Sequence, residues 1–383
     1  MRTAIVHYWL LGMRGGEKVL EALCRLLPSA DIYTLFYDPD RVSDTIRSHP
    51  VTASYLNSLR RHHRILLPLM PSALESFDLR EYDLILSSES GPAKGVLTPS
   101  HSRHVCYCHT PMRYLWELYP AYLNEWTASR WKRTLMRPLT RHLRLWDFAS
   151  AARVDDFVAN SENVRRRIWK TYRRAADVVH PPVPVEQFEH RPPEDYFLAV
   201  SELVPYKRLD YAVRTFAQSG RRLKVVGDGP EYRALKALAG DRVEFCGRVP
   251  DRELRELYSH CRAFLLPGEE DFGIATVEAL ASGKPVIALD RGGALDTVPI
   301  EPLGGVLYQQ PSPESLLDAL DRFEQEEAYF CAEELQSWAA QFSEASFQEK
   351  MRRILGLYDS RGRAVPQPAD RRSNTSSHTA AGS

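Results

Sequence analysis

The hydrophobic residues of the chain fall into short continuous runs, and most of these runs are followed by a stretch of helical periodicity. Runs without polar alternation suit strands that are covered on both faces, as in parallel sheets. Ten such runs are found, at 4–9, 31–36, 82–88, 104–109, 156–161, 196–201, 223–229, 243–247, 263–268 and 285–290. Helical patterns follow several of them, at 17–27, 162–172, 208–217, 231–239 and 251–261. This order predicts an α/β protein with doubly wound parallel sheets.

A break in the pattern divides the chain in two. The stretch HPPVPVEQFEHRPPED at 180–195 holds five prolines and no periodicity, which is typical of a linker. We therefore predict two Rossmann-like domains facing a cleft, at 1–183 and 184–345. An amphipathic pattern at 342–358 predicts a last helix, of which 346–358 returns to the first domain. Residues 361–383 are polar and rich in proline and serine, and are expected to be disordered.

Composition narrows the class of protein. The 383 residues carry 50 acidic and 50 basic side chains, so no overall positive charge favours nucleic-acid binding. No run approaches the length of a membrane span, and the apolar start is too short for a signal peptide. Six cysteines do not make a disulfide scaffold, so we expect reduced thiols and a cytoplasmic location.

The largest group of candidate functional residues follows the run at 263–268. A helix is expected to begin near Asp271 and Phe272 and to end at Gly283. The acids at 269–271 suit the positive end of any helix dipole. Gly273, however, would also let a ligand approach the free N–H groups of the first turn, as diphosphates do.

A glutamate lies further along the same helix. Glu278 is surrounded by apolar residues, and a buried carboxylate needs partners. Either the hydroxyls of a sugar or an arginine could supply them.

Three other places join a strand end to a polar or glycine residue. Gly15 and Gly16 follow the first run and open a helix, which allows close approach of a ligand but also fits an ordinary turn. Gly227, with Gly229, lacks the third glycine of a dinucleotide fingerprint. His109 ends the run 104–109, where ligands of such folds bind.

Two further segments allow more than one interpretation. His104, Cys106 and Cys108 alternate along one strand and could hold zinc, although they do not have the spacing of a usual zinc knuckle. The segment 129–146 carries six basic residues and no acid, with a leucine or tryptophan every four residues and a proline, Pro138, that interrupts the pattern. It fits either an anionic membrane surface, joined by RRHHR at 60–64, or a helix packed on the first domain.

These blocks together resemble the retaining glycosyltransferases of family 4, which have the GT-B fold. GEEDFGIATVEALASGKPVIA at 268–288 contains the E-x7-E spacing of that family, from Glu270 to Glu278. GMRGGEKV (12–19), CHTPMRYLW (108–116), ANSENVRRRI (159–168), SELVPYKRLD (201–210) and VVGDGPE (225–231) resemble further blocks in the same order. Within the family, the chain resembles mannosyltransferases of surface-polysaccharide and O-antigen assembly.

The resemblance implies roles for individual residues. Glu270 and His109 would act at the transferred sugar, with Arg113 supporting the site, and Glu278 would bind the nucleotide ribose. The remaining donor-binding residues would be Gly15, Gly16, Lys207, Arg208, Gly227, Phe272, Gly273 and Ile274. The family's arginine five residues before the lysine is absent, because position 202 is Glu202. Arg208 or another cation would have to replace it.

The resemblance also implies a reaction. We expect a metal-independent transfer, without a cofactor, of a hexose from a nucleotide-sugar to a glycan or lipid-linked acceptor, with mannose from GDP-mannose as the preferred donor. A peripheral position on the inner face of the membrane would bring such an enzyme to its acceptor. Two alternatives remain, a nucleotide-sugar epimerase of the same architecture and a catalytically inactive sugar-binding partner.

Overall fold

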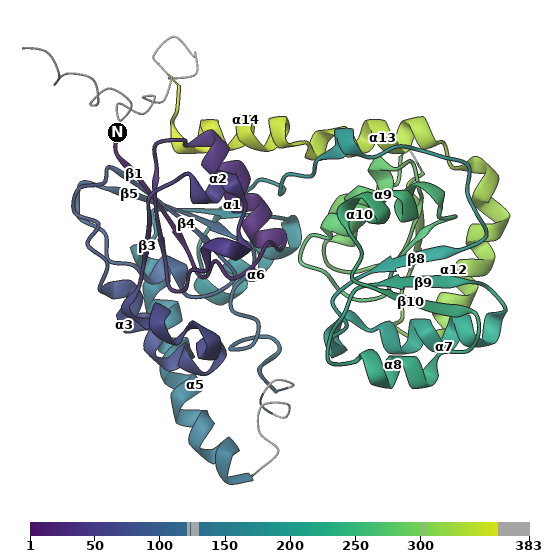
Figure 1. Ribbon diagram of the computed structural model, residues 1–383, viewed down its shortest axis with the longest axis horizontal. Coiled ribbons are helices and arrows are strands. Elements are labelled where there is room, and N and C mark those ends of the chain that lie inside the picture. The colour runs from purple at the N-terminus through teal and green to yellow at the C-terminus, as the bar shows by residue number, and fades with distance from the viewer. Residues whose placement is uncertain (121–122, 124–129, 302, 359–383) are drawn as a thin grey trace, which may run out of the picture. The chain divides into compact units, whose positions relative to one another are not determined.

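The computed structural model describes residues 1–120, 123, 130–301 and 303–358 (Figure 1). The predicted disordered tail at 361–383 lies outside these residues. Two compact units divide the chain. The first contains Met1–Ala159, Val164–Val179 and the described residues from Gln348, and the second contains Asn160–Asn163 and His180–Phe347.

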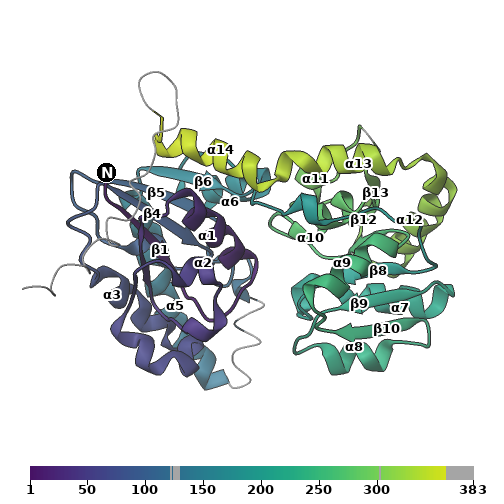
Figure 2. The same ribbon diagram turned by 45° about the horizontal axis from the view of Figure 1, so that its top comes forward.

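The first unit is built on a seven-stranded parallel sheet in the order β3-β2-β1-β4-β5-β6-β7. Figure 2 labels β1, β4, β5 and β6 of this sheet. Its strands are β1 Thr3–His7, β2 Asp31–Thr34, β3 Val51–Ala53, β4 Leu84–Glu89, β5 Arg103–Cys108, β6 Asp156–Ala159 and β7 Ala176–Val178. Its helices are α1 Gly15–Leu26, α2 Asp44–Arg47, α3 Met70–Glu75, α5 Arg130–Ser150, most of α6 Glu162–Tyr172 and most of α14 Glu344–Leu355. Short 3-10 helices join them, the longest being η2 Tyr55–Leu69.

The second unit is built on a six-stranded parallel sheet in the order β10-β9-β8-β11-β12-β13. Its strands are β8 Phe197–Val200, β9 Leu223–Val226, β10 Val243–Gly247, β11 Phe264–Leu266, β12 Val286–Leu289 and β13 Gly305–Tyr308. Its helices are α7 Leu209–Ser219, α8 Tyr232–Leu238, α9 Asp251–His260, α10 Ile274–Ala281, α11 Ala294–Thr297, α12 Pro313–Glu326 and α13 Ala332–Ala339.

Both faces of the second sheet are buried, which explains its continuous apolar runs. Along β11, Leu265 packs in one cluster with residues of α7 and α12, whereas Phe264 and Leu266 pack in another with residues of α9, α10 and α13. Figure 1 shows α9 and α10 on one side of β8–β10 and α7 and α8 on the other. Because successive side chains of a strand point to opposite faces, a strand covered on both sides must be apolar at every position.

The structure confirms the α/β fold with two doubly wound, Rossmann-like sheets, and each of the ten predicted strands is present. It also contains three short strands that the pattern did not predict, β3, β7 and β13.

Two local predictions are wrong. Helix α10 begins at Ile274 and not near Asp271, because Gly273 has φ 93° and ψ 62°, a left-handed conformation that ends the loop before the helix. The acids at 269–271 therefore precede the first turn. Pro138 does not interrupt its helix either, since α5 continues through it.

Candidate functional site

Each sheet has one point at which the strand order reverses. In the second unit β8 lies between β9 and β11, and in the first unit β1 lies between β2 and β4. The chain leaves the carboxyl ends of two such neighbouring strands in opposite directions, which opens a crevice where α/β proteins bind ligands. The loops after β8 and β11, and after β1 and β4, are therefore the expected positions of functional residues.

In the second unit the reversal point carries an ion pair between two predicted residues. Lys207, after β8, donates from Nζ to the carboxylate of Glu270, after β11. The side chains are 16% and 21% exposed, so a ligand can reach both. Burial lowers the pKa of Lys207, but the charge of Glu270 and the neighbouring Tyr206 and Asp271 raise it above its ordinary value. The ammonium is therefore charged at neutral pH and able to bind an anion.

Close backbone packing holds this pair in place. A Cβ on Gly268 would lie 2.6 Å from the carbonyl oxygen of Lys207, so only glycine lets the two loops meet. On the other side, Gly293 donates its N–H to the carbonyl of Glu270 at 2.8 Å, and a Cβ there would lie 2.2 Å from the carbonyl of Phe272. Sequence reasoning assigned no role to the Arg291-Gly292-Gly293 turn, although three small or polar residues after a buried strand were a usable signal.

The block ANSEN supports the same loop. Ser161 donates from its hydroxyl to the carbonyl of Asp271 at 2.6 Å, and Asn163 donates from Nδ2 to the carbonyl of Glu270 at 3.5 Å. These contacts orient the loop that carries Glu270 without using its carboxylate.

The start of α10 presents backbone groups only. The Phe272 side chain is 3% exposed and stacks on His180 with ring centroids 5.3 Å apart, so it belongs to the core. The N–H groups in the first turn of a helix have no partner within the helix. Those of Gly273, Ile274 and the next residue are thus the donors that this loop can offer to a diphosphate.

Glu278 is buried in α10, as the pattern predicted, with 7% of its surface exposed. Tyr258 of α9 donates its hydroxyl to Oε2 of Glu278 at 2.9 Å. Burial and the neighbouring carboxylate both raise the pKa of Tyr258, so the hydroxyl keeps its proton. The partner seen here is a tyrosine, where the sequence left a choice between an arginine and a sugar.

Other predicted donor residues serve the fold in ways that the structure explains. Arg208 pairs through Nε with Asp210 at 3.0 Å and does so from a left-handed backbone, φ 55°. Glu202 is exposed in the loop after β8. At Gly227 the φ is 132° and a Cβ would lie 1.9 Å from the carbonyl oxygen of Ser201, so the packing of the chain requires glycine at this position.

In the first unit the predicted residues gather around His109. The Nε2 atom of His109 lies 3.1 Å from the hydroxyl of Ser88, and the backbone N–H of His109 donates to the carbonyl of Glu89 at 2.7 Å. Gly15 and Gly16 open α1, and a Cβ on Gly16 would lie 3.8 Å from Nε2 of His109. The glycine therefore leaves room beside a partly exposed imidazole.

Two residues of this neighbourhood were missed. A Cβ on Gly16 would also lie 3.1 Å from the hydroxyl of Tyr8 and 3.8 Å from Cε1 of His7. Burial, together with the nearby His109, lowers the pKa of His7 to about 3, so His7 is neutral. Both residues stand at the carboxyl end of β1 or directly after it, which was the available signal.

Behind His109 lies a buried ionic cluster that the sequence did not reveal. Lys94 donates from Nζ to Asp147 and lies 3.3 Å from Oε1 of Glu89, and all three side chains are at most 1% exposed. Tyr172 and Trp116 also donate to Asp147, at 3.0 Å and 2.7 Å. Burial raises the pKa of Glu89 to about 7, although Lys94 opposes the shift.

The zinc site and the membrane-binding segment that the sequence left open have limited support in the structure. Among the described residues no group of three or more acidic, histidine or cysteine side chains is placed to hold a metal ion. Within 129–146, Leu139 and Leu143 pack with Met112 and Leu115 of the first unit, as expected of a packed helix. Trp131 and Leu135 have side chains outside the described set. No described helix has the length and apolarity required to cross a bilayer.

Two family models match the chain, one after the other. The model described as Glycosyltransferase Family 4 matches residues 13–187, and the model described as Glycosyl transferases group 1 matches residues 185–344. Together they extend over both units.

Curated relatives share parts of the chain. The GDP-mannose-dependent alpha-mannosyltransferase of Mycobacterium tuberculosis is 39% identical over 100 residues, which are 26% of this chain and 26% of that protein. The O-antigen chain mannosyltransferase RfbU of Salmonella typhimurium is 29% identical over 201 residues, 45% of this chain and 55% of that protein. The chain thus spans about half, or less, of the length of the curated relatives it matches.

Solved structures match over nearly the whole length. The lipopolysaccharide outer core galactosyltransferase WaaB, in its apo form, has a TM-score of 0.66 at 16% identity, over 93% of this chain and 99% of that one. Anabaena Alr3699/HepE in complex with UDP-glucose has a TM-score of 0.66 at 16% identity, over 93% and 100%. At this identity the likeness shows the fold, which is GT-B.

Proposed function

The chain belongs to the family 4-like glycosyltransferases of the GT-B fold, and from this premise we propose that it transfers a hexose from a nucleotide-sugar to a glycan or lipid-linked acceptor with retention of configuration. The observation that carries the proposal is the accessible Lys207–Glu270 pair at the strand-order reversal of the second unit, next to the amides of Gly273 and Ile274. A cation and free N–H groups suit the diphosphate of the donor.

The proposed reaction makes one bond and breaks one. An acceptor hydroxyl oxygen bonds to the anomeric carbon, and the bond from that carbon to the diphosphate oxygen breaks. The nucleoside diphosphate leaves with the bonding electrons and takes the proton of the acceptor. Its growing charge is offset by Lys207 and the α10 amides, because fixed donors stabilise charge that develops in a transition state.

Each carboxylate has a separate proposed task. Glu270 holds hydroxyls of the transferred sugar, for which its partly exposed position beside Lys207 is suitable. Glu278, oriented by the Tyr258 hydroxyl, binds the ribose of the nucleotide. In the first unit, His109 contacts the sugar, and Gly16 adds no side chain to the space beside it.

Mannose from GDP-mannose is the donor we propose. Support comes from relatives that are named GDP-mannose-dependent alpha-mannosyltransferase and O-antigen chain mannosyltransferase. A structural neighbour was solved with UDP-glucose, so a uridine donor is the comparison to include.

The test is a donor screen with the full chain. GDP-mannose and UDP-glucose, each labelled in the sugar, are incubated with and without a polyprenyl diphosphate-linked sugar, and products are separated by chromatography. Label transferred from GDP-mannose to the acceptor, with the configuration checked by NMR, supports the proposal. A new nucleotide-sugar in the absence of acceptor would indicate an epimerase, and tight binding without turnover would indicate an inactive partner.

A further inference from the structure

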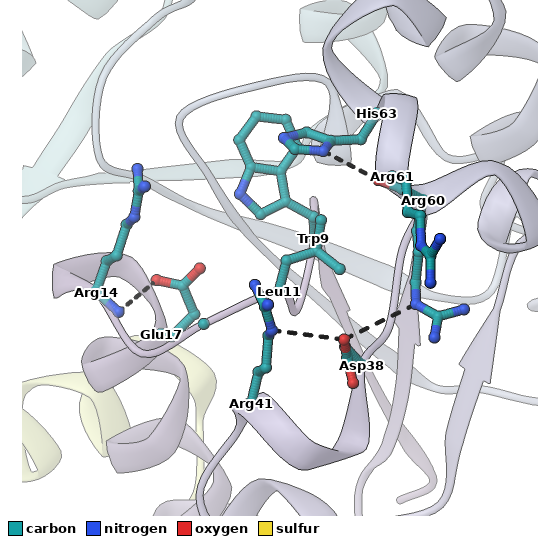
Figure 3. A pocket seen from close by; sticks show the side chains of 10 residues that line it. Trp9, Leu11, Arg14, Glu17, Asp38, Arg41, Arg60, Arg61 and His63 are labelled. Carbon is teal, nitrogen blue, oxygen red and sulfur yellow. Dashed lines mark hydrogen bonds and ion pairs between the residues drawn. The ribbon is translucent and has the colours of Figure 1, made fainter. Parts of the chain in front are cut away.

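A basic pocket of about 410 Å³ lies in the first unit, and none of the residues assigned above to donor binding lines it. Four segments form it: the loop after β1, the first turn of α1, the 3-10 helix η1 Pro39–Arg41 with the residue before it, and η2 (Figure 3). Its lining includes Trp9, Arg14, Asp38, Arg41, Arg60 and Arg61. Part of the RRHHR group, for which the sequence offered a membrane surface as one of two alternatives, thus lines a cavity.

The arginines of this pocket outnumber its carboxylates. Asp38 is shared by two of them, with Oδ2 3.6 Å from Nε of Arg41 and 3.9 Å from Nε of Arg60. Figure 3 marks both contacts, each from an arginine Nε to this single carboxylate. Arg61 forms no ion pair with any described residue. Like charges held this close repel one another, and a multivalent anion would relieve the repulsion.

The second acid of the pocket is Glu17, in the first turn of α1. Glu17 is 1% exposed and accepts the backbone N–H of Arg14 at 3.0 Å. Burial raises the pKa of Glu17, which favours its neutral form more than in water. The carboxyl group is therefore engaged in capping α1.

An apolar side accompanies the charges. Trp9 lies edge-on to His63, with ring centroids 5.2 Å apart, and Leu11 stands beside it. The same loop continues through Gly12 and Arg14 to Gly15 and Gly16, and a Cβ on Gly16 would lie 3.8 Å from Nε2 of His109. A molecule bound here would therefore extend along the chain segment that leads to the imidazole.

We propose that this pocket binds the phosphate or diphosphate group of the sugar acceptor. The identification of the ligand as an acceptor rests on the proposed function, whereas the anion-binding site itself does not depend on it. Guanidinium groups fit phosphate oxygens with two parallel hydrogen bonds, and several of them around one cavity favour a doubly or triply charged group over a carboxylate. The indole of Trp9 gives the adjoining sugar or prenyl segment an apolar surface.

The test compares two double variants of the full chain. Arg60→Ala/Arg61→Ala removes two pocket cations, and Arg47→Ala/Arg80→Ala removes two exposed arginines of the same unit that do not line the pocket. Inorganic pyrophosphate is titrated by calorimetry in a Lys207→Ala background, so that the donor-binding cation does not contribute. We expect the pocket variant to bind about tenfold more weakly than the control variant.

The source of the anion is decided by a second measurement. Co-sedimentation is followed with phosphatidylcholine vesicles containing 5 mol% undecaprenyl diphosphate, roughly enough to recruit a basic site, and with phosphatidylcholine alone. Loss of diphosphate-dependent sedimentation in the pocket variant indicates a lipid-linked acceptor. Unchanged sedimentation, combined with weaker pyrophosphate binding, indicates a soluble sugar phosphate.

Equal pyrophosphate affinity in the two double variants would overturn the proposal. So would loss of all pyrophosphate binding on Lys207→Ala alone, because the anion would then bind only in the second unit. Neither result depends on turnover, so the outcome is separate from the donor screen. If no donor is consumed but the pocket variant still binds pyrophosphate more weakly, the proposed function fails and the anion site stands.

Discussion

Each unit holds a lysine paired with a carboxylate at the end of a central strand, and the two pairs differ in exposure. Lys94 and its partners Glu89 and Asp147 are at most 1% exposed. Lys207 and Glu270 are 16% and 21% exposed. The chemistry is the same, but water and ligands reach only the second pair.

Exposure decides what a pair can do. Lys94 cannot exchange its partners without opening the core, so it holds β4, α5 and the segment next to His109 in one arrangement. Under the proposed function, Lys207 would leave Glu270 for the diphosphate of the donor, because a ligand can reach both side chains. A buried pair thus stabilises the local structure, whereas an accessible pair is able to contact a ligand.

Removal of the buried lysine should have the largest effect. Lys94→Met leaves Glu89 and Asp147 without their cation, and breaking a buried pair costs about 3–5 kcal/mol of the free energy of unfolding. The measurement is urea unfolding followed by circular dichroism. Lys207→Met is the matched control and should change stability by less than about 1 kcal/mol. Equal losses in the two variants would refute the contrast.

Removal of the accessible carboxylate, Glu270, should lower activity and leave stability nearly unchanged. Glu270→Ala should lower the rate of transfer by about 100-fold to 1,000-fold, because a contact to the reacting sugar is lost. Its free energy of unfolding should change by about 1 kcal/mol or less. Transfer assays and urea unfolding are run on the same preparation. A large loss of stability in Glu270→Ala would instead show that Glu270 is needed for folding.

The buried cluster should also make stability depend on pH. The pKa of Glu89 is raised to about 7, so the folded state holds a proton that the unfolded state releases. Stability from this group is complete at low pH and is lost as the pH rises toward 7, by up to about 3 kcal/mol. Glu89→Gln, which cannot titrate, should remove that loss.

The check is the pH dependence of stability in wild type and in Glu89→Gln. Stability is measured at several pH values between 5 and 8, roughly the window in which the Glu89 contribution disappears. Relative to wild type, Glu89→Gln should become more stable as the pH rises. Parallel curves for wild type and Glu89→Gln would show that Glu89 does not titrate in this range.

The same contrast explains what the sequence predicted and what it did not. Strands such as β11 were found because both their faces are buried and every position is apolar. The edge strands β3 and β7 were missed because their three residues are only partly covered and carry a polar centre. Local patterns report burial, and these strands have little of it.

The candidate site was predicted unevenly for a related reason. Glu270 and Lys207 came from blocks that resemble a family, and the structure adds that the two form a pair across 63 residues of chain. Lys94 and Asp147 are 53 residues apart and have no such block. A contact between distant polar residues leaves no periodicity, so neither the cluster nor its support of His109 could be read from the pattern.

The smallest expected effect tests Glu278, whose burial lies between those of the two pairs. Tyr258→Phe removes the hydroxyl that donates to Glu278, at a cost of about 1 kcal/mol in the free energy of unfolding. If the carboxylate binds ribose, its looser orientation should raise the KM for the nucleotide-sugar by less than about tenfold and leave kcat unchanged. Glu278→Gln should raise that KM further. A loss of stability without any change in KM would place Glu278 with Lys94, as a residue that maintains the fold, and not with Lys207.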